Sequence, residues 1–275
     1  MPLFRYPGGS LTFGRRTALM GVLNVTPDSF SDGGDWSDPD RAVRHARRMV
    51  REGADLIDVG GESTRPGART VPAAVEIRRV VPVIERLAAE GVLVSIDTSK
   101  AAVARAAFHA GAKILNDVTA LRGDGPMAKT AARAGVGVIL MHMKGTPRTM
   151  QKNPQYRDVV AEISDFFREI LKSAWRAGIE RDKIMLDPGI GFGKAPKHNL
   201  EILRRLDEFR RLGRPLAIGT SRKGFIGRAL GRSVHDRVSG TGATVAAAIL
   251  RGADLVRVHD VREMSDVVRM TDLLR

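Results

Sequence analysis

The segment Gly21–Gly34, GVLNVTPDSFSDGG, begins as an apolar run and then breaks into a series of turn-forming residues. Its first half is typical of a strand that is buried on both faces, because apolar residues follow one another without charges. The apolar run ends on Asn24, and the loop that follows is rich in Thr, Pro, Asp and Ser. This combination predicts a strand that ends in oxygen ligands and is followed by a loop that moves.

The same pattern of an apolar run followed by polar residues recurs along the chain. Eight candidate strands lie at residues 18–25, 54–61, 92–99, 112–118, 136–143, 183–189, 215–221 and 254–261. Amphipathic helical stretches lie between them, for example at 39–52, 76–90, 100–111 and 198–213. Strands that alternate with helices of this length indicate βαβ units and a parallel sheet. Eight such units predict an α/β fold of the (β/α)8 TIM-barrel type, and a doubly wound open sheet is the alternative.

The first sixteen residues, 1–16, have a different character from the repeating units. They contain two short β-type runs on either side of Pro7-Gly8-Gly9, which is a turn sequence. We therefore expect a short N-terminal β-hairpin before the first barrel strand. No stretch resembles an interdomain linker, so residues 1–275 are expected to form a single domain.

The composition limits the class of protein. Of the 275 residues, 43% are hydrophobic and 28% are charged, as in ordinary globular proteins, and the chain contains no cysteine. Disulfides, thiolate metal sites and cysteine nucleophiles are therefore excluded. No apolar run reaches the roughly 18 residues of a membrane span, and no signal-peptide pattern is found at the N-terminus. We expect a cytoplasmic protein that does not bind membranes.

The formal net charge of +14 raises the alternative of a nucleic-acid-binding protein. The basic residues, mostly arginine, are scattered over helical faces and are not clustered beside aromatic residues. This distribution favours a solvated basic surface over a nucleic-acid footprint. It remains compatible with a smaller anion, such as a phosphorylated substrate.

Polar residues stand at the carboxyl end of every apolar run. They are Asn24, Asp58, Glu62, Asp97, Asn116, Asp117, His142, Asp187, Ser221, Arg257 and His259. In a barrel these ends converge on one rim, where barrel enzymes carry out their chemistry. A single polar residue at such a place is commonly a turn former or a helix cap, but a full set in one register is not explained in that way. Buried polar groups without partners are costly, so the set predicts a polar ligand.

One part of the expected rim suits a planar heterocycle. Asp97, Asn116 and Asp187 can accept from a guanidine-like edge, and the amide can also donate to a ring carbonyl. Phe192, in the loop GIGFGK after the sixth strand, is available for stacking. This loop departs from the nucleotide-binding P-loop pattern because no Ser or Thr follows its lysine.

The other part of the rim suits a charged group. Donors for an anion come from Ser221, Lys223, Arg257 and His259. An arginine presents a bidentate fork that matches phosphate. Asn24 and the acids of the following loop offer the hard oxygens that Mg²⁺ prefers. We therefore expect a magnesium-bound diphosphate beside a polar planar ring.

The strand ends and the loops after them also carry a family resemblance. Eight segments resemble, in order and in spacing, the signature segments of the dihydropteroate synthase family: MGVLNVTPDSFSDGG, DVGGESTRPGA, VSIDTSK, LNDVTA, MHMKGTP, DPGIGFGK, GTSRKGFIG and VRVHDV. The resemblance covers nearly the whole chain and implies a pterin-binding (β/α)8 barrel. The departures are few: Gly224 replaces a common Ser or Arg, and residues 67–80 are less acidic than usual.

The resemblance implies a reaction and a set of site residues. The reaction is the condensation of 7,8-dihydropterin-6-ylmethyl diphosphate with 4-aminobenzoate to 7,8-dihydropteroate and diphosphate. The implied pterin-binding residues are Asp97, Asn116, Asp187 and Lys223. The implied diphosphate-binding groups are Thr64, Ser221, Arg257, the backbone at Val258, His259 and a magnesium ion on Asn24. The implied aminobenzoate pocket consists of Phe30, Pro66, Phe192 and Ser221. The catalytic set is Asp97, Asp187, Lys223, Asp32 and Arg65.

The chemistry that follows is SN1-like. Diphosphate leaves first, assisted by magnesium, and the neutral aryl amine then attacks the cation on the pterin methylene. The two long loops after the first two strands are expected to close over the site and to exclude water. The resemblance also implies inhibition by sulfonamides and a homodimer. The segments 241–252 and 266–274 are candidates for a helical interface, and packing of their small apolar faces on the barrel is the alternative.

Two other functions remain open from the sequence. A pterin-dependent methyltransferase on the same barrel would keep the pterin-binding acids but would not need the diphosphate-binding residues. A non-catalytic paralogue would bind a pterin or a protein partner without turnover.

Overall fold

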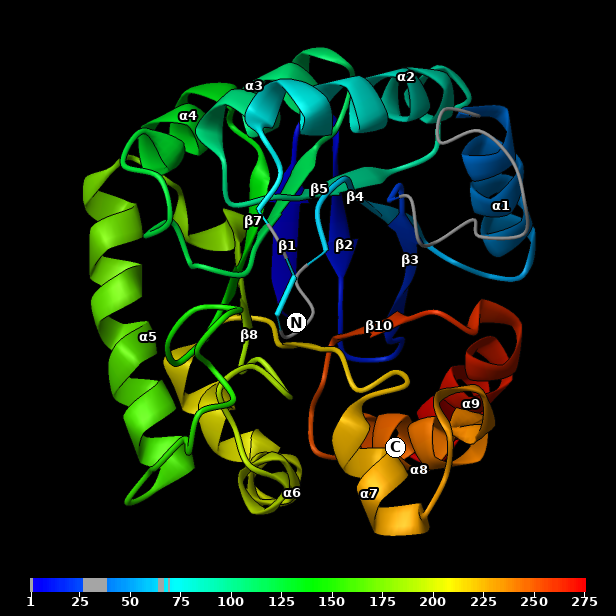
Figure 1. Cartoon of the computed structure of the whole chain (residues 1–275), viewed down its shortest axis with the longest axis vertical. Helices are drawn as coiled ribbons and strands as arrows, with labels where there is room; N and C mark the ends of the chain where they lie inside the picture. Colours follow the sequence, from blue (N-terminus) through cyan, green and yellow to red (C-terminus); the bar gives the residue numbers. More distant parts are fainter. Residues whose placement is uncertain (1, 27–38, 64–66, 69) are drawn as a thin grey trace.

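The structure is a computed structural model that describes residues 2–26, 39–63, 67–68 and 70–275. Within these residues, eight parallel strands form one sheet surrounded by helices (Figure 1). The strands are β3 (Ala18–Asn24), β4 (Leu56–Gly60), β5 (Val94–Asp97), β6 (Ile114–Asp117), β7 (Gly137–Met141), β8 (Ile184–Asp187), β9 (Ala217–Ile218) and β10 (Leu255–Val258). Their order in the sheet is β8-β7-β6-β5-β4-β3-β10-β9.

The sheet closes on itself between β8 and β9. A parallel bridge pairs Leu186 of β8 with Leu216, which directly precedes β9. The backbone N–H of Leu186 also donates to the carbonyl of Pro215 over 2.9 Å. These contacts join the two edges of the sheet, so the predicted TIM barrel is confirmed.

Helices cover the outside of the barrel and alternate with the strands in the chain. They are α1 (Pro39–Arg51), α2 (Ala73–Ala89), α3 (Ala101–His109), α4 (Met127–Ala134), α5 (Val159–Arg176), α6 (Pro196–Arg204), α7 (Gly224–Leu230), α8 (Val238–Leu250) and α9 (Val261–Leu273). In α1, Ala42, Val43, Ala46 and Met49 are buried, which is the spacing that places apolar side chains on one helical face. None of the described helices is both long and apolar enough to cross a lipid bilayer.

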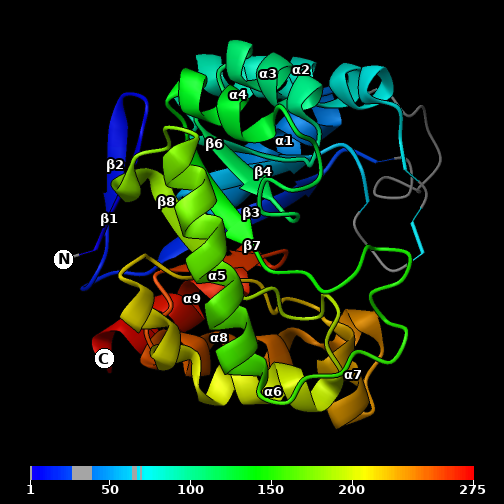
Figure 2. The ribbon, with the colours of Figure 1, turned by 90° about the vertical axis from the view of Figure 1, so that its left-hand side faces the viewer.

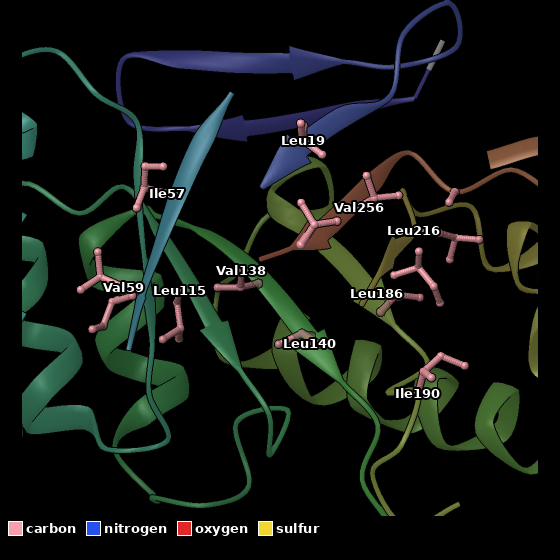
Figure 3. Close-up of a cluster of buried hydrophobic side chains, with 14 of the residues drawn as sticks. Leu19, Ile57, Val59, Leu115, Val138, Leu140, Leu186, Ile190, Leu216 and Val256 are labelled. Atoms are coloured by element: carbon pink, nitrogen blue, oxygen red, sulfur yellow. The ribbon is translucent and has the colours of Figure 1, made fainter. Parts of the chain in front are cut away.

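The main core lies between the strands and these helices. Figure 3 shows side chains from several strands that belong to it, including Leu19, Val59, Leu115, Leu140 and Val256. All five are at most 2% exposed. Because the helices take up the outward-facing apolar residues, the inward-facing positions at the strand ends are free to carry polar groups.

A second, smaller core closes the amino-terminal end of the barrel. Strands β1 (Leu3–Tyr6) and β2 (Gly9–Thr12) form the predicted hairpin, with Gly8 at a φ of 79° in the turn. Phe4 is fully buried, and Phe13 nearly so, among apolar residues from the interior of the barrel. Figure 2 shows the hairpin on the opposite side of the barrel from the loop that joins β7 to α5. The hairpin therefore acts as an apolar plug, and the polar strand ends lie at the other mouth.

The expected helix at 198–213 is divided in the structure. Helix α6 ends at Arg204, and residues Leu206–Leu212 form a 3-10 helix. In a 3-10 helix, residues three apart lie on one side, and here Leu206 and Phe209 are both buried. The Phe209 ring packs edge-on against Phe167 of α5, with a centroid distance of 6.2 Å.

Candidate active site

The carboxyl ends of neighbouring strands bring three of the predicted site residues into one row. Asn24 of β3 pairs in register with Gly60 of β4, Gly60 pairs with Asp97 of β5, and Asp97 pairs with Asn116 of β6. A Cβ atom at Gly60 would lie 3.6 Å from the Cβ of Asp97 and 3.7 Å from Oδ1 of Asn24. The glycine therefore leaves these two side chains close to each other across β4.

Arg257 of β10 connects the acids of this mouth. Its Nε donates to Oδ2 of Asp58 over 2.6 Å, and its Nη2 donates to Oδ2 of Asp97 over 2.8 Å. Nδ2 of Asn116 donates to the same oxygen of Asp58 over 2.9 Å. The Asp58 side chain is completely buried, whereas 25% of the Arg257 side chain is exposed. The network thus joins four strands and leaves part of the guanidinium group open.

Two oxygens of the network have no hydrogen-bond partner in the described part of the chain. They are Oδ1 of Asp58 and Oδ1 of Asp97, and both are buried. A buried acceptor without a donor costs free energy. The two oxygens are therefore suited to a ligand that presents N–H groups along its edge.

Burial changes the protonation of the acids at the mouth. It raises the pKa of Asp97 to about 7, even though the charge of Arg257 acts in the opposite direction. Burial also raises the pKa of Asp187, at the end of β8, despite a 2.7 Å hydrogen bond that its Oδ1 accepts from the N–H of Gly189. Asp97 therefore changes its charge near neutral pH.

Lys223 and Phe192, both predicted site residues, lie in contact. The Lys223 Nζ is 4.2 Å from the centroid of the Phe192 ring and donates to the carbonyl of Ile190 over 2.6 Å. Burial lowers the pKa of Lys223 to about 8, and the charge of Asp187 opposes this shift. The loop after β8 and the loop after β9 therefore meet over a lysine that is still mostly protonated at neutral pH but loses its proton more easily than an exposed lysine.

Ser221 and His259 form a second contact between strand ends. The Ser221 hydroxyl accepts from the backbone N–H of His259 over 3.1 Å and lies 3.0 Å from its Nδ1. Burial, together with the charge of Arg257, lowers the pKa of His259 to about 3, so its ring is neutral. The Val258 side chain packs in the outer core, so only its backbone is available to a ligand at the mouth.

The backbone between Ser221 and Lys223 is strained. Arg222 has a φ of 58°, in the left-handed region that residues with side chains seldom adopt. Its Nε donates to Oδ2 of Asp260 over 3.0 Å, and its carbonyl accepts from Nη1 of Arg237 over 2.9 Å. These partners fix the turn that carries Ser221 and Lys223. The sequence gives no direct sign of this arrangement.

Asp117, although it ends β6, serves the local backbone. Its Oδ1 accepts from the N–H and the hydroxyl of Thr119, both over 2.7 Å, and its Oδ2 accepts from the N–H of Leu121 over 2.9 Å. The carboxylate therefore stabilises the turn after β6. Of the two adjacent residues Asn116 and Asp117, Asn116 is therefore the one that takes part in the hydrogen-bond network at the barrel mouth.

Glu62 is likewise held by the protein itself. It forms an ion pair with Lys100, and its Oε2 accepts from the N–H of Val71 over 2.8 Å. Lys100 also contacts the buried Glu76 of α2, with an Nζ to Oε2 distance of 2.6 Å. This cluster connects the chain after β4 with α2 and with the chain after β5.

Five predicted residues, Phe30, Asp32, Thr64, Arg65 and Pro66, lie outside the described residues. Among the residues that are described, no group of three or more His, Asp and Glu side chains is arranged to hold a metal ion. Asn24 places its amide oxygen close to the Asp97 side chain, across Gly60 of β4. This donor set fits Mg²⁺, which commonly takes few ligands from a protein and the others from substrate phosphates and water.

Fold and site together define a (β/α)8-barrel enzyme whose mouth is lined by buried acids and cations. A family model described as pterin binding enzyme matches residues 20–259. Over 272 residues the chain is 45% identical to a dihydropteroate synthase of Synechocystis, and the aligned region covers 98% of this chain and 94% of the relative. It therefore belongs to the pterin-binding enzymes and, among them, to the dihydropteroate synthase family.

Solved structures of this family have the same fold. The dihydropteroate synthase of Yersinia pestis in complex with a sulfonamide drug matches with a TM-score of 0.94 and 44% identity, over 99% of both chains. That of Xanthomonas albilineans in complex with 7,8-dihydropteroate matches with a TM-score of 0.92 and 42% identity, over 99% of this chain and 98% of the other.

Proposed function

We infer that this chain is a transferase that condenses 7,8-dihydropterin-6-ylmethyl diphosphate with 4-aminobenzoate, giving 7,8-dihydropteroate and diphosphate for folate biosynthesis. The observation that carries this function is the pair of buried carboxylate oxygens, Oδ1 of Asp58 and Oδ1 of Asp97, that have no hydrogen-bond partner among the described residues. Such oxygens accept from the N–H edge of a reduced pterin. A relative with nearly the same fold is known in complex with the product of this reaction.

We propose that the pterin binds to Asp97, Asn116, Asp187 and Lys223. The open oxygen of Asp97 accepts from the ring edge, and the amide of Asn116, positioned by Asp58, fixes the register of the ring. Lys223, whose pKa is lowered to about 8, donates to a ring acceptor from the side of Phe192. Binding of N–H donors favours the ionised form of Asp97.

The diphosphate occupies the part of the mouth near Ser221 and His259 in this proposal. Hydrogen bonding of Ser221 to Nδ1 leaves Nε2 of the neutral His259 ring as the nitrogen that faces a ligand. The exposed part of Arg257 adds a positive charge, and Thr64 and the Val258 backbone add donors. These groups stabilise the charge that develops on the departing diphosphate.

We propose that Asn24 ligates a magnesium ion that is shared with the diphosphate. A bound magnesium ion supplies charge neutralisation for the leaving group. The protein's part in the next step is electrostatic: the ionised Asp97 and Asp187 favour a cation on the pterin methylene. The neutral amine of aminobenzoate, held against Phe192, then attacks without a strong base. Asp32 and Arg65 are proposed to stabilise this reacting state.

Four further properties accompany the proposed function. We propose that residues 1–275 act as one domain in the cytoplasm, without nucleic-acid or membrane partners. We also propose a homodimer, because large apolar side chains are exposed on or next to the two C-terminal helices. These are Leu250, Met270, Leu273 and Leu274, at 54%, 57%, 82% and 68% exposed. Sedimentation of the purified chain, compared with a Met270→Glu/Leu273→Glu variant, tests this interface.

The direct test is to incubate the purified chain with the dihydropterin diphosphate, 4-aminobenzoate and Mg²⁺ and to follow diphosphate release. The expected result is release over many turnovers that needs both the amine and magnesium and that a sulfonamide inhibits competitively with the amine. No release would favour a non-catalytic pterin-binding protein. Methyl transfer from a reduced folate to a corrinoid protein would favour the methyltransferase.

A further inference from the structure

The loop between β8 and α6 is held along its whole backbone. The four carbonyls from residue 190 to residue 193 each accept a hydrogen bond from a side chain. The donors, in order along the loop, are Lys223 at 2.6 Å, Gln151 at 2.7 Å, Lys194 at 2.9 Å and Tyr156 at 2.9 Å. This loop carries Phe192, so its position determines where the ring lies.

The loop also lies directly against the chain after β7. Gly189 and Gly193 have φ values of 71° and 67°, and a Cβ atom at either would clash with a backbone oxygen. The distances would be 2.0 Å to the carbonyl oxygen of His142 and 2.3 Å to that of Lys144. The two segments are therefore packed as closely as backbone allows.

Lys194 is the one donor to these four carbonyls that is sealed from solvent. It is only 1% exposed, and no carboxylate in the described part of the chain lies within ion-pair distance of it, although the charge of Asp187 acts on it from farther away. Its Nζ lies 2.9 Å from Nδ1 of His142, 3.3 Å from the carbonyl oxygen of His142 and 2.9 Å from the carbonyl oxygen of Phe192. A buried lysine without a carboxylate partner is rare enough to require an explanation.

The three contacts are all satisfied by an uncharged pair. Nδ1–H of His142 donates to the lone pair of the Lys194 amine, and the two amine N–H groups donate to the two carbonyls. Burial lowers the pKa of Lys194 well below its ordinary value and that of His142 to about 2. The pair thus provides directional hydrogen bonds without placing a net charge in the interior.

We propose that Lys194, paired with His142, is a positioning residue that fixes the Phe192 ring against Lys223 and thereby sets the affinity for aminobenzoate. The proposal rests on the proposed function, because Phe192 is assigned to the aminobenzoate pocket there. Lys194 acts through the Phe192 backbone and does not touch the substrate. Of the proposed pterin-binding residues, Asp97 and Asn116 belong to other strands, whereas Asp187 and Lys223 adjoin this loop. The KM for the pterin diphosphate is therefore expected to change much less than the KM for aminobenzoate.

The test compares Lys194→Met, which keeps length and loses all three hydrogen bonds, with Lys197→Met on the exposed face of α6. We expect the KM for aminobenzoate to rise at least ~10-fold in Lys194→Met, as for the loss of one or two hydrogen bonds. The kcat and the KM for the pterin diphosphate are expected to stay within about threefold. Lys197→Met is expected to behave as the wild type.

A second variant, at His142, completes the test. If Lys194→Met does not fold, His142→Leu removes the partner of the amine and is expected to raise the same KM by a smaller factor. Equal changes in both KM values, or a fall in kcat alone, would overturn the positioning role. A wild type without synthase activity would instead refute the proposed function, whereas an active wild type with an unchanged Lys194→Met variant refutes only this inference.

Discussion

Replacement of Asp97 by Asn removes a buried carboxyl group whose ionisation the fold opposes. Burial raises its pKa from the ordinary 3.8 to about 7, although Arg257 lies only 2.8 Å away. A carboxyl group with a higher pKa in the folded state keeps its proton when the unfolded chain has already lost it. The free energy of unfolding therefore falls as the pH rises from about 4 to about 7.

The magnitude follows from the shift. About three pKa units, at 1.36 kcal/mol each, amount to about 4 kcal/mol of lost stability at pH 8. An amide resembles the protonated acid in shape and charge, so Asp97→Asn is expected to match the wild type near pH 4. At pH 8 we expect it to be more stable by up to about 4 kcal/mol, while its turnover is nearly abolished.

Urea unfolding of both proteins between pH 4.5 and pH 8 measures this difference directly. Titrating groups that behave alike in the two proteins cancel in the difference between their free energies of unfolding. The dependence of this difference on pH therefore reports on Asp97 and its neighbours. Asp165→Asn on the exposed face of α5 is the control, and we expect a change of less than about 0.5 kcal/mol at every pH. A difference that does not depend on pH, or one that favours the wild type at pH 8, would refute the reasoning.

Three further variants test other parts of the structure. Arg257→Ala leaves two buried carboxylates without their cation, so urea unfolding at pH 8 should show a loss of ~3–5 kcal/mol, and diphosphate release should nearly stop. Phe4→Ala should cost ~3–5 kcal/mol in the same measurement, with an unchanged kcat per folded molecule, because it empties the plug at the far end of the barrel. In the Phe4→Ala/Asp97→Asn double variant the two stability changes should add, since the sites share no partners; a total at pH 8 that departs from the sum by more than about 1 kcal/mol would contradict this separation.

The barrel could be predicted because its strands are buried on both faces. Continuous apolar runs such as residues 136–141 stand out between amphipathic stretches, and only a few topologies accommodate eight such units. The exact ends of short strands and helices were harder to predict from the sequence. In the run at 215–221 only Ala217–Ile218 form a strand, preceded by the single bridge at Leu216, because the next residues turn into the loop that carries Ser221. The division of residues 198–213 depends on packing of Phe209 against α5, which local sequence does not show.

Site residues could be predicted where the residue type and its position along the strand both place a polar side chain at the barrel mouth. Asn116 and Asp117 are adjacent polar residues at the end of one strand, and successive residues of a strand point to opposite faces. Only Asn116 shares its face with Asp97, whereas Asp117 binds the following turn. From the sequence alone, both Asn116 and Asp117 were candidate site residues. The resemblance to a family selected Asn116, and the hydrogen bonds of Asp117 give the physical reason.

Lys194 marks the limit of prediction from the sequence. Its partners are two carbonyl oxygens and a histidine that lies 52 residues earlier in the chain. Backbone acceptors carry no signal in the sequence, so GFGK reads as a glycine-rich loop with one more basic residue. Arg222 presents the same difficulty, because its left-handed backbone is imposed by Asp260 and Arg237 from other elements.

The two ends of the barrel contribute to stability in opposite directions. At the mouth, the open oxygens of Asp58 and Asp97 and the raised pKa of Asp97 make the free protein less stable than an apolar interior would. At the other end, Phe4 and Phe13 complete a closed apolar layer that needs no ligand. A ligand that donates N–H groups to the open oxygens satisfies them and lowers the pKa of Asp97, so it stabilises the fold by mass action. Under the proposed function, the same unpaired acids that weaken the free protein therefore contribute binding free energy for the pterin, while the apolar plug contributes stability that does not depend on a ligand.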